Sequence, residues 1–108
     1  MKKSTKDLIY GGDRMYVILV YDIGQVDNNE GARVLRNVFK TCKKYLHHIQ
    51  NSVFEGEISK AKREKLKYEL KEWIRKKRDS LIIFVENNNK WLKKEFLGLK
   101  EDKTSNMI

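Results

Sequence analysis

A single carboxylate, Asp22, stands where the longest apolar stretch of the chain ends. Residues 15–21 (MYVILVY) are all apolar or aromatic, and a run rich in Val, Ile and Tyr is typical of a β-strand buried on both faces. A carboxylate held at the end of a rigid strand suits a hard metal ion or an acid–base role. An aspartate that merely opens a loop is the simpler alternative. Asp22 is therefore the first candidate for chemistry.

Positive charge is the second chemical signal. Lys and Arg number 24 against 15 Asp and Glu, which gives a formal net charge of +9. Such an excess favours a polyanionic partner, most simply nucleic acid, although a lysine-rich protein without such a partner is the alternative. The basic residues concentrate on two expected helices, where they face either phosphate or water: Arg33, Arg36, Lys40, Lys43, Lys44, Lys76, Lys77 and Arg78.

Other reactive residue types give weak signals. His47 and His48 are adjacent in an expected strand, so they point to opposite faces and form a poor pair for one metal ion. Cys42 is the one cysteine, which excludes an intramolecular disulfide and a cysteine-based zinc site. No P-loop, GxSxG or dinucleotide-binding glycine pattern is present. With no signal peptide visible, the expected location is cytoplasmic and no membrane partner is expected.

The elements that position these residues follow from periodicity. The sequence predicts a strand over 15–22, a helix capped at Asn28 or Asn29, one bent strand or two short ones over 47–58, a helix capped by Ser59, and a strand over 80–85. A turn is expected at 87–89, and residues 90–98 fit either an edge strand or a short helix. The buried stripes are expected to be as follows: Val34, Leu35, Val38, Phe39, Cys42 and Leu46 on the first helix, and Leu66, Leu70, Trp73 and Ile74 on the second.

This order of elements predicts an α+β fold, the ferredoxin-like βαββαβ arrangement. Both helices would cover one face of the sheet. The strands over 15–22 and 80–85 are nevertheless apolar on both faces, so the other face also needs a cover. A second copy of the chain is the simplest cover, which predicts a sheet-to-sheet homodimer.

The domain organisation follows from polarity. Residues 1–14 are polar and contain the pair Gly11-Gly12 shortly before the strand, so they are expected to be an N-terminal extension: a translated leader, a flexible arm or a cloning remnant. Residues 15–98 form the expected domain, including the C-terminal strand segment. Residues 99–108 form a polar tail.

Three stretches carry a resemblance to a known family. Residues 16–23 (YVILVYDI), 49–56 (IQNSVFEG) and 90–98 (KWLKKEFLG) with 104–106 (TSN) resemble CRISPR-associated protein 2, of a type I-like subgroup. That family is the small partner of the integrase that acquires CRISPR spacers. With the order of elements, the resemblance covers nearly all of residues 15–108.

The resemblance implies a ferredoxin-like fold with an extra C-terminal strand that crosses to the partner of a homodimer. It implies a metal-dependent endonuclease for RNA or DNA, with Mg²⁺, or Mn²⁺ in its place, bound between the two copies of Asp22. Tyr21 precedes that residue in the family motif and is carried over as catalytic. Ser52 and Phe54 belong to the second motif and are carried over as nucleic-acid-binding. The implied partners are the CRISPR-associated protein 1 integrase and duplex DNA, with single-stranded RNA as an alternative ligand.

The chain also departs from the family pattern. His48 stands where some nucleases of the family have an arginine, and Gly31 stands where some members are basic, while Arg33 is kept. These departures bear on catalysis more than on DNA carrying. The first functional hypothesis is therefore a dimeric adaptor that carries prespacer DNA for the integrase. The alternative is a stand-alone Mg-dependent endoribonuclease or toxin-like ribonuclease.

Overall fold

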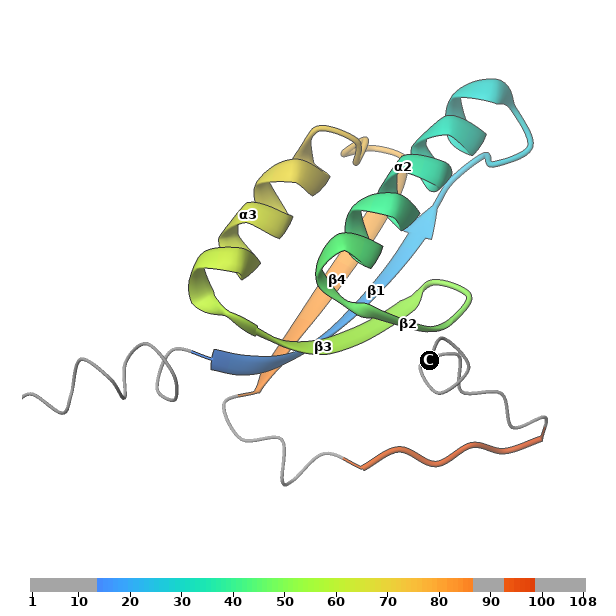
Figure 1. Ribbon diagram of the computed structural model, residues 1–108. Coiled ribbons are helices and arrows are strands. Elements are labelled where there is room, and N and C mark those ends of the chain that lie inside the picture. The colour runs from blue at the N-terminus through green and yellow to red at the C-terminus, as the bar shows by residue number, and fades with distance from the viewer. Residues whose placement is uncertain (1–13, 87–92, 99–108) are drawn as a thin grey trace, which may run out of the picture.

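The computed structural model describes residues 14–86 and 93–98, which fold into two layers, a sheet and a pair of helices. Figure 1 shows the order of elements, β1 (Arg14–Ile23), α2 (Asn29–Tyr45), β2 (His47–Gln50), β3 (Val53–Ser59), α3 (Lys60–Lys71) and β4 (Asp79–Glu86). This is the predicted βαββαβ order, and the region from 47 to 58 forms two strands.

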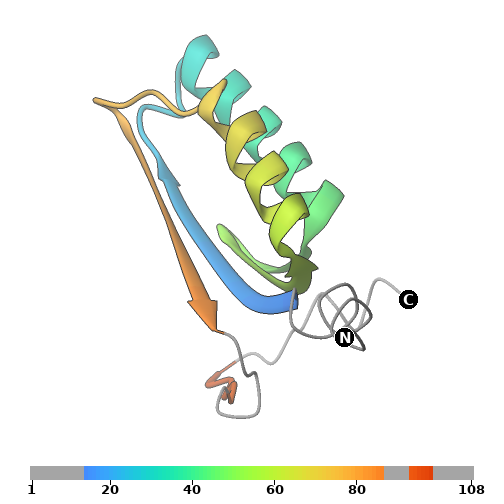
Figure 2. The ribbon, with the colours of Figure 1, turned by 90° about the vertical axis from the view of Figure 1, so that its left-hand side faces the viewer.

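The four strands form one antiparallel sheet in the order β2-β3-β1-β4. The first strand is therefore central and pairs on both edges. Val20 lies between Val53 of β3 and Ile82 of β4, and Asp22 lies opposite Ser80. Both helices cover the same face of the sheet, as the side view in Figure 2 shows. The predicted ferredoxin-like fold is confirmed.

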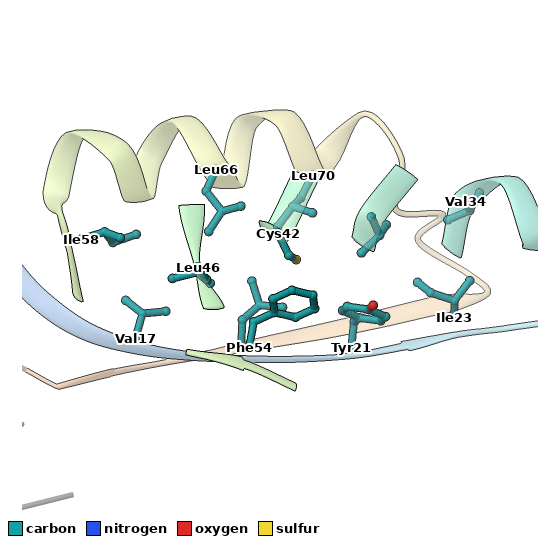
Figure 3. Close-up of a cluster of buried hydrophobic side chains, with 12 residues drawn as sticks. Val17, Tyr21, Ile23, Val34, Cys42, Leu46, Phe54, Ile58, Leu66 and Leu70 are labelled. Atoms are coloured by element: carbon teal, nitrogen blue, oxygen red, sulfur yellow. The ribbon is translucent and has the colours of Figure 1, made fainter. Parts of the chain in front are cut away.

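The core lies between the sheet and the helices. Alternate residues of β1, namely Val17, Leu19 and Tyr21, point into it and are buried. Phe54 of β3 is fully buried beside them, and Leu66 and Leu70 close the core from α3 (Figure 3). Every second residue of the strands thus packs against the apolar face of each helix in one continuous core.

Among the described residues, no helix covers the opposite face of the sheet over β1 and β4. Ile18 and Val20 of β1 are half-buried, while Ile82 and Phe84 of β4 are 52% and 56% exposed. The sequence predicted two apolar faces for these strands, and the structure leaves one of them open in the single chain. We call this surface the open face.

Both helices begin at the predicted caps. The Asn28 side chain accepts a hydrogen bond from the Gly31 amide, and the Ser59 hydroxyl accepts one from the Lys62 amide. The predicted stripe of α2 is confirmed, with Cys42 at its centre and fully buried.

The end of α3 differs from the prediction. Lys76, Lys77 and Arg78 were expected in its last turn, but the helix ends at Lys71. They lie instead in the turn before β4. Trp73 and Ile74 also follow the helix, and both still pack on the core.

The described C-terminal residues, 93–98, lie against β2 and β3 on the side of the sheet away from the helices (Figure 1). Lys94 Nζ donates to Glu55 Oε2 at 2.5 Å, and the Tyr16 hydroxyl donates to the other oxygen of that carboxylate. These six residues form neither strand nor helix in the single chain.

Several sequence-based expectations lie outside the described residues. They are the extension before residue 14, the turn at 87–89, the start of the C-terminal segment at 90–92, and the tail at 99–108. Within the described part, no helix is long and apolar enough to cross a membrane.

Candidate metal and nucleic-acid site

Asp22 lies near the end of β1 and is exposed on the open face. Cross-strand pairing places it opposite Ser80, next to the row formed by Val20 and Ile82. Its carboxylate makes no hydrogen bond or ion pair within the described part of the chain. An unpaired carboxylate on a rigid strand fits a hard divalent cation, because Mg²⁺ commonly takes one or two carboxylates and keeps several waters.

One carboxylate alone does not make a metal site. The described residues contain no group of three or more His, Cys, Asp or Glu side chains placed to hold a metal ion. A second protein ligand would therefore have to come from another molecule, such as a second copy of the chain. The open face, which carries Asp22, is the surface where that copy would lie.

Tyr21 and Asp22 do not share a site, although they are adjacent in sequence. Successive residues of a strand point to opposite faces, and Tyr21 points into the core with 4% of its surface exposed. Its ring stacks on Phe54 at 6.0 Å between centroids. Burial raises the pKa of the Tyr21 phenol to about 12, so the hydroxyl keeps its proton at neutral pH. The structure does not bring this hydroxyl to the carboxylate of Asp22.

The loop that follows Asp22 is held by a buried ion pair. The side chain of Asp79 is fully buried and accepts hydrogen bonds from the Gly24 amide at 3.0 Å and the Arg75 amide at 2.8 Å. The Arg75 guanidinium donates to both oxygens of Asp79 at 2.9 Å, and its Nη2 donates to the Gly24 carbonyl at 2.7 Å. These bonds join the loop to the start of β4, and we call them the Arg75–Asp79 clamp.

The clamp has a clear electrostatic signature. Hydrogen bonds from Arg75 lower the pKa of Asp79 from 3.8 to about 2, against the opposing effect of burial. Glu30 at the start of α2 adds an ion pair to Arg75 at 3.5 Å. Arg78 donates a hydrogen bond to the side chain of Gln25 at 2.8 Å, so part of this guanidinium is bound to the loop after Asp22. Arg75 and Asp79 are four residues apart, but sequence patterns gave no signal that they hold Gly24, which lies 51 and 55 residues before them.

The second motif forms the turn between β2 and β3. Its Ser52 carbonyl accepts a hydrogen bond from the Tyr21 amide at 3.2 Å. His48 Nε2 is 2.8 Å from the Asn51 carbonyl, and Asn51 adopts a positive φ of 38°. His48 is thus a buried support of this turn, and His47 points outward as the alternation predicted.

Phe54 does not occupy the position expected of a nucleic-acid contact. It is 0% exposed, and its ring packs against those of Tyr21, Phe39 and His48. A ring enclosed in this way has no surface to offer a base, so the sequence-based assignment is corrected to a core role. Its motif neighbour Ser52 is half-buried and reaches the surface.

The basic residues of α2 are exposed, as predicted. They lie on the helix side of the molecule, opposite the open face: Arg33, Arg36, Lys40, Lys43 and Lys44. Lys76 and Lys77 are exposed in the turn after α3. Ion pairs of Arg75 and Arg78 with Glu30 place that turn near the start of α2. The two groups of cations therefore share one side of the molecule.

The sequence of the chain matches a known protein family over most of its length. The sequence profile of the family described as CRISPR associated protein Cas2 matches residues 15–94. The chain belongs to the Cas2 family. The match spans β1 to β4 and ends at Lys94, which pairs with Glu55.

Curated members of the Cas2 family resemble the chain over most of their length. A protein from Fusobacterium nucleatum named "CRISPR-associated endoribonuclease Cas2" is 51% identical over 108 residues, all of both chains. The protein of the same name from Thermotoga maritima is 41% identical over 87 residues, which cover 81% of this chain and 92% of that one. One from Halalkalibacterium halodurans is named "CRISPR-associated endonuclease Cas2" and is 38% identical over 86 residues, 80% of this chain and 88% of that one.

Solved Cas2 structures share the fold. Cas2 of Streptococcus pyogenes matches with a TM-score of 0.67 and 33% identity, covering 78% of this chain and 100% of that chain. A second crystal structure titled as Cas2 matches with a TM-score of 0.64 and 34% identity, covering 84% of this chain and 92% of that chain.

Proposed function

We propose that the chain acts as a dimeric carrier of duplex DNA in CRISPR spacer acquisition and presents that DNA to the CRISPR-associated protein 1 integrase. One observation carries the proposal. The two sides of the molecule differ in character, because the open face is apolar whereas the helix side is rich in exposed cations. A second copy docked on the open face would leave both sets of helices pointing outward.

The open face supports a dimer on energetic grounds. Exposed Ile82 and Phe84 continue the row of half-buried Ile18 and Val20, so docking would remove a contiguous apolar surface from water. We propose that the C-terminal segment extends from this docked pair to the partner's β4, which lies at an edge of the sheet and can accept another strand.

The basic side supports binding through phosphates. The cations of α2 are exposed along one helix face, although Lys44 also pairs with Glu69 of α3 and Arg33 lies over the ring of Trp73. Binding should weaken steeply with salt, with a log–log slope of roughly −0.9 for each phosphate contacted. It should show little sequence preference, because phosphate contacts position a protein but do not read bases. A shallow slope, or strong discrimination between duplexes of equal length, would contradict this part of the proposal.

Metal-dependent phosphodiester cleavage is a second proposed activity, favoured by the unpaired Asp22 and by the endonuclease names of the relatives. Asp22, with its copy from the partner, would hold Mg²⁺ or Mn²⁺. The bound ion would supply Lewis-acid stabilisation of the scissile phosphate. The Arg75–Asp79 clamp would fix the loop beside Asp22 and so keep the carboxylate in place. RNA and DNA both present the phosphate this chemistry needs.

One substitution separates the two activities. Asp22→Asn keeps the size of the side chain and removes its charge, so it should abolish metal-dependent cleavage and leave dimerisation and spacer acquisition in place. The exposed Asp27→Asn in the same loop is the matched control. If Asp22→Asn loses spacer acquisition and Asp27→Asn keeps it, the proposal that the carrier role is independent of cleavage is refuted. Unchanged cleavage in the same purified variant would refute Asp22 as the metal ligand.

A further inference from the structure

A cavity of about 810 Å³ lies on the helix side, between α2 and the turn joining β2 to β3. This volume is within the range of pockets that hold a small organic ligand. Its lining combines three kinds of residue: apolar or aromatic Ala32, Leu35, Phe39 and Tyr21, cationic Arg36 and Lys40, and polar Asn51 and Ser52. No carboxylate lines it.

The floor of the cavity contains an unused hydrogen-bonding group. Tyr21 is 4% exposed, and its hydroxyl makes no hydrogen bond within the described part of the chain. Buried tyrosine hydroxyls usually have a partner. The other two tyrosines with partly buried hydroxyls follow that rule, since Tyr45 donates to Glu69 and Tyr16 to Glu55. The hydroxyl of Tyr21 is therefore available to a ligand that enters the cavity.

The rim of the cavity is positively charged on one side. Arg36 and Lys40 are four residues apart on α2, so they lie one above the other on the same helix face. Both are exposed, and neither makes an ion pair within the described chain. The opposite wall offers the Asn51 amide and the Ser52 hydroxyl. An aromatic floor beside two free cations is complementary to a flat aromatic ring that carries a phosphate.

We propose that this cavity binds one unpaired nucleotide of a bound nucleic acid, with the base in the cavity and the adjoining phosphate at Arg36 and Lys40. The inference rests on the proposed nucleic-acid binding and names the part of the substrate that this site takes. Phe39 supplies aromatic surface to the base, and the Tyr21 hydroxyl donates to one of its oxygen or ring-nitrogen acceptors. Duplex ends that carry an unpaired nucleotide would thus bind better than blunt ends.

The test compares two DNA duplexes of equal paired length, one blunt and one with a single unpaired 2-aminopurine nucleotide at an end. Affinity is measured at one fixed salt concentration, because phosphate contacts change with salt. The parent protein should bind the second duplex about 5- to 100-fold more tightly, the range that stacking of one base on an aromatic side chain supports. The 2-aminopurine fluorescence should fall on binding as its base stacks.

Two variants locate the effect in the cavity. Tyr21→Phe removes only the hydroxyl and should lower the affinity ratio of the two duplexes about 2- to 10-fold. Ala32→Leu narrows the cavity with a good helix-forming residue and should lower the ratio toward one. Tyr68→Phe is the matched control, because Tyr68 is 71% exposed on α3 and does not line the cavity, so its ratio should equal that of the parent.

The outcomes separate this proposal from the one on which it rests. A parent ratio of one, with firm binding of the blunt duplex, overturns the nucleotide site and leaves the carrier function standing. Failure to bind either duplex at low salt overturns the carrier function and the site together. If the affinity ratio of the two duplexes is high and neither cavity variant lowers it, the unpaired base binds elsewhere and the proposed site is overturned. If the ratio is one and Ala32→Leu loses binding to purified integrase, the cavity takes a protein side chain instead.

Discussion

Replacing Asp79 with asparagine should destabilise the protein in a pH-dependent way. The carboxylate of Asp79 is fully buried and accepts four hydrogen bonds, three from Arg75 and one from the Gly24 amide. Its pKa falls from 3.8 to about 2 in the folded chain. Because one pKa unit corresponds to about 1.4 kcal/mol, the charged form contributes about 2 kcal/mol to folding.

The asparagine variant should cost more than this contribution alone. Its amide group presents a donor where Arg75 also donates. The Arg75 guanidinium, with a side chain 16% exposed, then keeps only the exposed Glu30 carboxylate, at 3.5 Å, as a counter-charge within the described chain. Removing one partner of a buried ion pair costs up to about 3–5 kcal/mol. We expect a loss of about 2–4 kcal/mol at pH 7, measured by urea unfolding at one fixed protein concentration so that dimerisation contributes equally.

The sign of the pH dependence follows from the direction of the shift. A carboxyl group whose pKa is lowered on folding stabilises the protein fully above its unfolded pKa of 3.8, and the contribution is lost as pH falls through its folded pKa of about 2. The difference in unfolding free energy between the parent and Asp79→Asn should therefore be constant from pH 7 to about 5 and decrease between about pH 4 and 2. Asp27→Asn, an exposed change in the neighbouring loop, should stay within about 0.5 kcal/mol of the parent at every pH. A difference that does not decrease in acid would refute the clamp's electrostatic origin.

Three further predictions follow from burial and close contacts. Gly31→Ala should cost more than about 1 kcal/mol of unfolding free energy, because a Cβ there would lie 1.9 Å from the Gln25 carbonyl oxygen; an unchanged urea midpoint would contradict this. If the proposed dimer forms through the open face, Phe84→Lys should be a monomer at micromolar concentration in sedimentation experiments with an unchanged circular dichroism spectrum, and a dimer of this variant would place the interface elsewhere. Burial raises the pKa of the Cys42 thiol from 9.0 to about 12, so at pH 8 a disulfide reagent should label it only after denaturant is added, and rapid labelling of the native protein would refute that burial.

The elements of the fold could be predicted because their signals are local. The caps at Asn28 and Ser59 each need one side chain and an amide three residues away. The apolar strands are visible as short uninterrupted runs. The apolar character of the second sheet face was also predictable, and Ile82 and Phe84 are exposed on it; a second copy as its cover stays a prediction.

The end of α3 could not be predicted, because a long-range interaction decides it. The apolar stripe of Leu66 and Leu70 continues at helical spacing with Trp73 and Ile74 past Lys71, so the local pattern gives no reason to stop. In the structure, Arg75 and Asp79 bind each other and the backbone of Gly24, which holds the chain in the turn after the helix. Periodicity carries no information about a partner some 50 residues away.

The exposure of Asp22 could be predicted, and its role as a metal ligand stays a prediction. Asp22 is exposed at the end of a strand, as its place in the sequence indicated. Motif resemblance carried over Tyr21 as catalytic and Phe54 as nucleic-acid-binding, but the structure buries both. Strand alternation alone would have separated Tyr21 from Asp22, because adjacent residues of a strand point to opposite faces. The cavity around Tyr21 joins three separate segments, so no single stretch of sequence marks it.

The position of β1 between two paired strands also limits how the chain can evolve. Insertion or deletion of one residue within β1 would reverse the direction of every side chain beyond the change. Tyr21 would then turn outward, and the carboxylate of Asp22 would enter a space now filled by hydrocarbon. On one side of β1, β3 could not compensate without shifting its own register with β2. This strand can therefore vary in composition but not in length, and changes in length are confined to the connections and the ends of the chain.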